Sequence, residues 1–245
     1  FYHSKYAFGR TRPPKKKSGT YRVIKYTLLI IVVISLGIGY YVYQAMFTSN
    51  TWTPGEEPVS VYIEAGDTFD DITKKIYSKG LVVNRHTFVW LAKRKDYPEN
   101  VKIGHYLIKE DMTNNELLNV MQAGIQTPVD VIFHNINTLP ELSERISNQL
   151  VFDSVDLMNK LRDTSYLSQL GFDTTTVKAM FIPNTYELYW TATPKKFLER
   201  MKKEYEKFWH EKRVKKAEKI DFTPFEVSIL ASIIEKETNK NDEKS

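Results

Sequence analysis

The chain has 245 residues, of which 42% are apolar and 27% are charged, and it contains no cysteine. This composition is typical of a globular protein, and the lack of cysteine excludes disulfides, thiolate nucleophiles and cysteine-ligated zinc sites. The five histidines form no H-x-H or H-x-x-x-H pair, so we expect neither a metal site nor a cofactor. His105 and His134 adjoin predicted strands and are interpreted as structural.

The net charge of +5 is concentrated at the N-terminus. Residues 1–25 carry eight of the 35 basic residues and no acidic one, so 27 basic residues remain against 30 acidic ones in the rest of the chain. A basic tail directly before an apolar run is more typical of a membrane-topology signal than of a nucleic-acid surface. We therefore expect residues 1–22 to be a cytoplasmic tail, and we expect no nucleic-acid partner.

An uncharged run of 18 residues follows, from Tyr26 to Tyr43. As a helix it would rise about 27 Å, close to the thickness of the hydrocarbon core of a bilayer. The alternative, a cleaved signal peptide, needs a small-x-small cleavage site, and residues 42–47 offer none. The run therefore predicts a transmembrane helix over residues 23–45. No basic residue lies between it and Lys74, so residue 50 onward is expected outside the cytoplasm.

Residues 46–58 are rich in polar and turn-forming residues and are interpreted as a linker. The region 59–125 then combines two predicted strands, Val59–Ile63 and Val101–Ile108, with three helices. The first helix follows Thr68 as its N-cap and the second begins after Asn84. The third, Asn114–Ala123, is preceded by a capping box of the type Thr-x-x-Glu.

A similar cycle begins at residue 126 and continues to residue 245. Its only predicted strand is Val129–Phe133, and its predicted helices are 140–150, 154–162, 166–170, a long charged helix 194–217, and a last helix from Pro224. Thr223 is the N-cap of the last helix, with proline at its first position and Glu226 at the third. Short strands alternating with helices indicate the α+β fold class.

The last helix carries the strongest candidate for chemistry, Glu235. At 100° per residue its side chain lies above three small residues, Ser228, Ala231 and Ser232, which leave open space in front of the carboxylate. The alternative is that Glu235–Lys236–Glu237 is an ordinary solvated helix end, and the pattern alone favours that alternative.

Three segments resemble the endolytic murein transglycosylases, the MltG/YceG-like family. The run A-S-I-I-E-K-E-T at 231–238 is similar to the family's signature, and F-I-P-N-T-Y at 181–186 is similar to a second motif. Residues 59–124 resemble its LysM-like module, so the resemblance covers about residues 20–240. It implies that region 126–245 belongs to a catalytic domain in which Glu235 is the catalytic acid. Asn184 and Tyr186 are candidate substrate-binding residues: Asn184 would hydrogen-bond the substrate or else cap a turn, and Tyr186 would stack on a sugar ring or else belong to the core.

The implied reaction needs only one carboxylate. In a lytic transglycosylase the C6 hydroxyl of muramic acid attacks C1 of the same sugar, so one glutamate can serve as acid and then as base. The resemblance also implies the outer face of a bacterial cytoplasmic membrane as the location. Peptidoglycan glycan strands, that membrane and cell-wall synthases are the expected partners.

The sequence departs from the family pattern at two places. Lys178–Ala179 stands where the family usually has Glu-Gly, and the sequence starts at Phe1 and stops at Ser245, directly after the acidic helix. We therefore expect a chain truncated at its C-terminus and inactive by itself, with Ile229, Ile233 and Ile234 partly exposed. The alternative function is a membrane-tethered module that binds peptidoglycan through residues 59–124 without cleaving it.

Overall fold

The computed structural model describes residues 19–134 and 136–237, apart from the side chains of residues 19, 20, 235 and 236. Most of the predicted basic tail, residues 1–18, lies outside these described residues. The chain divides into two compact units, residues 1–48 and 49–245. The described part is a mixed α+β structure with one apolar helix near its N-terminus, as expected.

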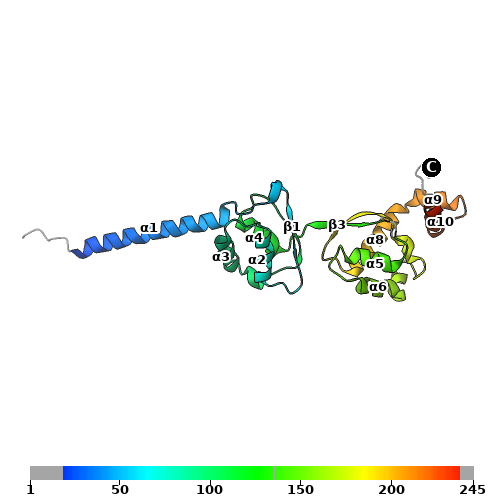
Figure 1. Cartoon of the computed structure of the whole chain (residues 1–245), viewed down its shortest axis with the longest axis horizontal. Helices are drawn as coiled ribbons and strands as arrows, with labels where there is room; N and C mark the ends of the chain where they lie inside the picture. The colour runs from blue at the N-terminus through cyan, green and yellow to red at the C-terminus, as the bar shows by residue number, and fades with distance from the viewer. Residues whose placement is uncertain (1–18, 135, 238–245) are drawn as a thin grey trace, which may run out of the picture. The chain divides into compact units, whose positions relative to one another are not determined.

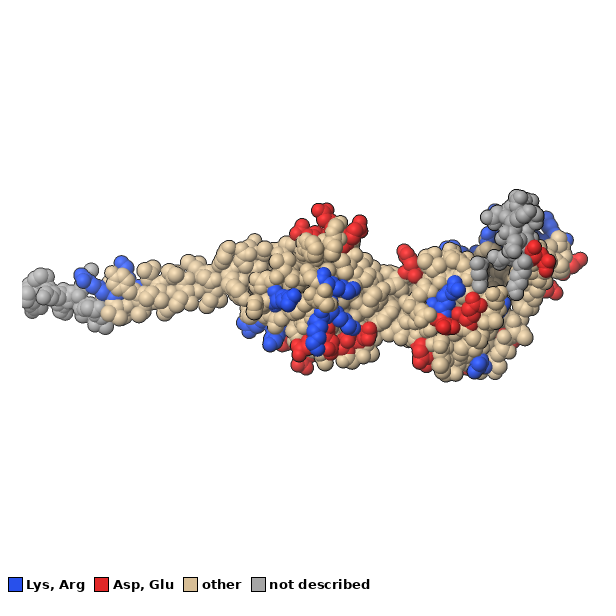
Figure 2. Space-filling view, viewed as in Figure 1, with Lys and Arg blue, Asp and Glu red and all other residues tan. Residues whose placement is uncertain are grey.

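The first unit is built on a single long helix, α1 (Gly19–Phe47). It is long and apolar enough to cross a membrane, so a helix of the required kind stands where the span was predicted and extends beyond it at both ends. Its apolar side chains face outward along its length; Leu28 and Leu36 are more than 60% exposed. Beyond its basic first turns the helix carries no charged residue (Figure 2). The direction in which α1 would cross a membrane stays a prediction.

The second unit begins with a lobe that we call the first lobe, residues 49–127 (Figure 1). A two-stranded antiparallel ribbon pairs β1 (Val59–Ile63) with β2 (Gly104–Ile108), so that Val61 lies opposite Tyr106. The helical elements of this lobe are η1 (Pro54–Glu56), α2 (Phe69–Ser78), α3 (Arg85–Arg94), η2 (Tyr97–Glu99) and α4 (Asn114–Ala123). The predicted caps at Thr68, Asn84 and Thr113 all form.

Part of the predicted linker is a folded part of this lobe. Thr51 forms an antiparallel bridge with Val82, and Ser49 forms one with Thr113. Asn50, Thr51 and Thr53 are buried polar residues. Interpreting residues 49–53 as linker is therefore wrong, because their polar side chains bond inside the lobe. The composition of the segment gave no sign of these partners, which lie 34 to 64 residues away along the chain.

The second lobe, residues 128–237, repeats the plan of a ribbon with helices. β3 (Pro128–Phe133) pairs antiparallel with β4 (Asn184–Tyr189), a strand that we did not predict. The helical elements are α5 (Leu139–Ser147), α6 (Ser154–Arg162), α7 (Thr164–Gln169), η3 (Val177–Met180), α8 (Pro194–Phe208), α9 (Glu211–Glu218) and α10 (Pro224–Glu237). One apolar core joins the ribbon to α5–α8, and Phe133, Ile146 and Phe197 are fully buried in it.

The predicted long charged helix is two helices. It stops at Trp209 because the backbone of His210 is extended, with ψ at 163°, which interrupts the helical hydrogen bonds. Arg213 then folds back from α9. Its guanidinium lies 3.9 Å from the centre of the Phe208 ring and donates to the Phe208 carbonyl at 3.0 Å. The prediction was wrong because a tertiary contact of Arg213 satisfies the end of α8, where no glycine or proline marks a break.

The last helix, α10, begins as predicted but packs loosely. Thr223 and Glu226 form the reciprocal capping box, with the Thr223 amide donating to the Glu226 carboxylate at 2.8 Å. The apolar side chains of the helix remain 42–52% exposed at four positions: Ile229, Leu230, Ile233 and Ile234. The expected exposure of these isoleucines is confirmed, and α10 is the least covered helix of the described second unit.

Candidate functional site

The motif F-I-P-N-T-Y forms the turn into β4 and its first residues. Asn184, a predicted substrate-binding residue, is exposed at the start of β4, opposite Phe133. Its side-chain oxygen accepts a hydrogen bond from the Thr185 amide at 2.8 Å. Asn184 is therefore open to a ligand, and its role in binding stays a prediction.

Tyr186, the other predicted binding residue, lies in the core. Its ring stacks on Phe133 with 5.4 Å between ring centres, and its hydroxyl donates to the Ile182 carbonyl at 2.5 Å. Burial, reinforced by the charge of Glu204, raises the pKa of Tyr186 to about 12, so the phenol stays a neutral donor. Tyr186 thus holds the motif in its turn, and a direct contact with substrate stays a prediction.

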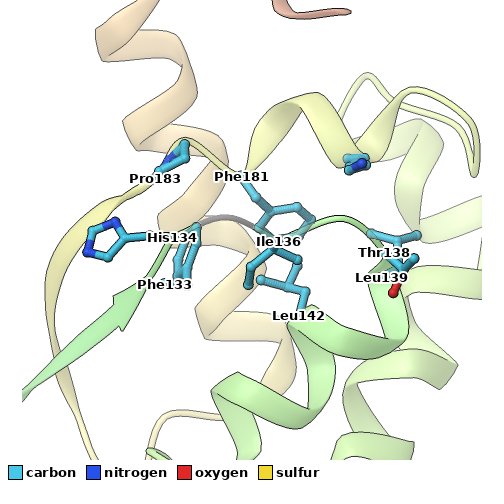
Figure 3. Close-up of a pocket in the computed structure, with 9 residues that line it drawn as sticks. Phe133, His134, Ile136, Thr138, Leu139, Leu142, Phe181 and Pro183 are labelled. Carbon is cyan, nitrogen blue, oxygen red and sulfur yellow. The ribbon is translucent and has the colours of Figure 1, made fainter. Parts of the chain in front are cut away.

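A small pocket of about 50 Å³ lies where the ribbon ends, between α5 and η3 (Figure 3). Its walls are mainly apolar. Nine residues line it: Phe133, His134, Ile136, Thr138, Leu139, Leu142, Lys178, Phe181 and Pro183. Figure 3 shows the rings of Phe133 and Phe181 beside Ile136 and Leu142, with His134 and Pro183 at one side. The motif therefore supplies part of the pocket wall.

The loop over this pocket is held by charged side chains. Lys178, on η3, donates from Nζ to the Asn137 carbonyl at 2.6 Å, and Glu141 accepts from the Asn137 amide at 3.0 Å. Arg145 donates to the His134 carbonyl at 3.3 Å. Sequence reasoning noted Lys178 only as a departure from a pattern, because its partner lies 41 residues away. These contacts shape a rim that carries positive charge.

The two histidines interpreted as structural differ. His105 is buried, with Nδ1 2.9 Å from the Thr127 carbonyl and Nε2 2.9 Å from the Ser60 hydroxyl, which confirms the interpretation. His134 is exposed and lines the pocket, so its structural interpretation is wrong. His134 directly follows Phe133, the last residue of β3, and so belongs to the loop after the strand.

The predicted catalytic helix joins this region through η3. α10 contacts η3, the turn that carries Lys178 and directly precedes the F-I-P-N-T-Y motif. Glu235 lies in the last turn of α10, and its side chain is outside the described residues. Glu237 is exposed. Among residues 19–134 and 136–237 no three His, Asp or Glu side chains gather closely enough to hold a metal ion.

Comparison with known proteins supports the relationship inferred from the motifs. The sequence model of the YceG-like family matches residues 61–245. A crystal structure of a YceG-like protein from Listeria monocytogenes is 22% identical, with a TM-score of 0.45, over 76% of this chain. The match spans 66% of the Listeria chain, and no curated protein matches. Because the family model covers well over half of the sequence, this chain belongs to the YceG-like family.

Proposed function

We propose that this protein is a membrane-anchored endolytic transglycosylase that cleaves peptidoglycan glycan strands. Membership of the YceG-like family is the observation that carries the proposal. The meeting of α10 with the turn η3, beside the pocket and the F-I-P-N-T-Y motif, supports it, because the two motif segments are far apart in sequence. In this proposal α1 anchors the protein in the bacterial cytoplasmic membrane, and the lobes face outward near the cell-wall synthases.

Glu235 is the proposed acid and base. As a carboxylic acid it protonates the glycosidic oxygen while the bond from that oxygen to C1 of muramic acid breaks. The C6 hydroxyl of the same sugar then forms the new bond to C1 and gives its proton to the Glu235 carboxylate. The products are a free 4-hydroxyl and a 1,6-anhydro end, and Glu235 is protonated again. The tethered attack avoids the entropy cost of bringing in a second molecule.

The proposal is tested by Glu235→Gln, made in protein expressed from the complete gene because this chain spans 66% of the solved relative. Glutamine keeps the size of the side chain but neither donates nor accepts the proton, so strand cleavage should fall by about 10²–10⁴-fold. Glu237→Gln, two residues along the same helix, is the matched control and should retain most of the activity. Mass spectrometry of the digests should find 1,6-anhydromuramic ends.

Three results would contradict the proposal in different ways. Reducing ends in place of anhydro ends would mean hydrolysis, which needs a water and usually a second carboxylate. Near-normal cleavage by Glu235→Gln would remove Glu235 from the mechanism and make Glu237 the next candidate. Glycan binding by the wild type with no cleavage at all would favour the alternative, a tethered binding module.

A further inference from the structure

We propose that the outward face of α3 docks on the anionic phospholipid headgroups of the membrane that α1 crosses. This inference rests on the part of the proposed function in which α1 is a membrane anchor, and it adds a second contact between the first lobe and the same membrane. It involves neither a glycan nor catalysis, so it can be tested without any cleavage assay.

Charge is divided unevenly along the first lobe. Residues 49–71 contain six acidic residues and no basic one, whereas residues 72–95 contain seven basic residues and no acidic one. Figure 2 shows red side chains gathered at two edges of this lobe and blue ones between them. Over residues 49–127 nine basic residues stand against eleven acidic ones, a net charge of −2. The net charge therefore conceals a basic surface, to which α3 belongs.

The outer face of α3 is basic and partly apolar. The residues that the helix buries are Thr87, Phe88, Leu91 and Ala92. Two rows of residues spaced by four remain outside: Arg85, Val89 and Lys93 form one, and His86, Trp90 and Arg94 form the other. The two arginines, the lysine and the histidine are exposed, and the valine and tryptophan between them are half-buried. Cations around a tryptophan are typical of protein surfaces at the level of lipid headgroups.

Two of these cations have no anionic partner inside the protein. Among residues 19–134 and 136–237, neither Lys93 nor Arg94 lies within ion-pair distance of a carboxylate. Arg85 lies over the ring of Tyr77, 4.5 Å from its centre. The next acidic residue, Asp96, comes after α3 has ended and has a left-handed backbone, with φ at 53°. The positive charge of this face is therefore available to an external anion.

The start of α3 is bonded to the segment that leaves α1. The Val83 amide donates to the Asn50 carbonyl at 3.0 Å, and the Asn84 amide donates to the Asn50 side chain at 2.6 Å. Asn50 is three residues beyond Phe47, the last residue of α1, and three residues span at most about 11 Å. A lobe tethered so closely meets the bilayer at a high effective concentration, so a few cations suffice. Val83 is 71% exposed and would be covered by the membrane.

A lipid surface fits this face better than a folded acidic partner does. Lys93 and Arg94 are adjacent, whereas Arg85 is eight residues before Lys93, or about 12 Å along the helix. A protein partner would need carboxylates fixed at matching positions, whereas headgroups in a fluid bilayer move to whichever cation is presented. The tether also keeps the bilayer within reach at all times. We therefore assign this face to phospholipid headgroups.

The test uses the absence of cysteine from the chain, because one introduced cysteine then carries a spin label at one known place. The whole chain, labelled at His86→Cys, is reconstituted into vesicles of phosphatidylcholine alone or of equal parts phosphatidylcholine and phosphatidylglycerol. Collision with oxygen, compared with collision with a water-soluble nickel complex, should place this label at headgroup depth only in the anionic vesicles. A label at Ala65→Cys, in the acidic stretch, should stay in water in both. A label at Leu36→Cys reports separately whether α1 lies in lipid.

Charge variants separate this contact from simple proximity. Lys93→Gln with Arg94→Gln should lower the ratio of docked to undocked lobe by about tenfold or more, since each cation near an anionic surface contributes about fivefold. Lys74→Gln with Lys102→Gln removes the same amount of charge outside α3 and should leave the depth of the label unchanged. All four side chains are exposed, so the fold should survive both changes.

The outcomes distinguish this proposal from the proposed anchor. A His86 label that stays in water in anionic vesicles, while the Leu36 label lies in lipid, would overturn the docking of α3 and leave the anchor intact. Equal depth with and without phosphatidylglycerol, or unchanged docking after the loss of Lys93 and Arg94, would also overturn it. A Leu36 label in water would overturn the anchor and the docking together. Because no glycan is present, a failure of the proposed catalysis would leave these depths unchanged.

Discussion

The two lobes of the second unit share a plan but differ in how completely they are packed. In the first lobe the segment that enters it is held by hydrogen bonds: the buried side chains of Asn50 and Asn114 bond to each other, and Asn50 also bonds to the backbone of Asn84. In the second lobe the ribbon and α5–α8 enclose a core, whereas α10 leaves four apolar side chains about half exposed. The motif residues lie in the less complete lobe. The comparison shows that the first lobe is tied together throughout, whereas the second presents a partly uncovered apolar helix face.

The comparison is tested most severely at Asn50. Asn50→Ala removes the hydrogen bonds that Asn50 makes with the buried Asn114 side chain and with the Asn84 amide, so the first lobe should lose about 2–4 kcal/mol of unfolding free energy. Hydrogen exchange measured lobe by lobe during urea unfolding would show the loss. Asn115→Ala, on the same helix as Asn114, should cost less than about 1 kcal/mol. Equal losses from both would mean that these hydrogen bonds add little.

Acid should weaken both lobes over the same pH range. Hydrogen bonds from the Thr68 hydroxyl lower the pKa of Asp71 to about 2, and those from Thr175 and Thr176 lower the pKa of Asp173 to about 2. A depressed carboxyl pKa stabilises the fold above the unfolded value of 3.8, and this contribution is lost as the pH falls toward 2. Unfolding measured from pH 5 to pH 2 should show it. Asp71→Asn should flatten the response of the first lobe only, and a response from the other lobe would contradict this.

The capping boxes of α4 and α10 allow a direct test of how differently the two helices are packed. Thr113→Ala and Thr223→Ala each remove an N-cap worth about 1 kcal/mol, at α4 and α10 respectively. Because α4 is packed into its lobe, its variant should lower the stability of the whole first lobe. The variant at α10 should fray that helix alone, seen as faster amide exchange in α10 with the remaining second lobe unchanged. A global loss from Thr223→Ala would show that α10 is integral to the core.

The smallest effect is expected on the exposed face of α10. Ile233 is 52% exposed, so Ile233→Ser should change the stability of this chain by less than about 0.5 kcal/mol. Ile76→Ser, at a fully buried position of the first lobe, should cost several kcal/mol by comparison. Thermal unfolding of the two variants would decide. A large loss from Ile233→Ser would mean that this face is covered in solution.

Local features of the fold could be predicted from the sequence. The helix starts at Thr68, Thr113 and Thr223 were predictable because each cap bonds to an amide only three residues away. The strand β1 was recognised from alternation over five residues. The candidate acid Glu235 was found because its motif is contiguous, although its side chain lies outside the described residues.

Features that depend on distant partners could not be predicted. β4 is a strand because it pairs with β3. The sequence of β4 alone shows no pattern that predicts this pairing. The ordering of residues 49–53 depends on Met112, Lys109 and Asn114. The pocket needs α5, η3 and the end of β3 together. Lys178 and His134 both line it, and no sequence motif around either residue predicts that they line the same pocket.

The wide separation of the paired strands has a consequence for how the chain folds. Ile63 meets Gly104 and Phe133 meets Asn184, so each ribbon closes only after a long helical insertion has been drawn together. Closing such loops costs entropy before any strand contact compensates for it, whereas the capped helices can form from neighbouring residues alone. Helices should therefore appear early and the ribbons late, with folding slower than that of a helical bundle of equal size. A single proteolytic cut within either insertion would remove the link that makes ribbon closure intramolecular.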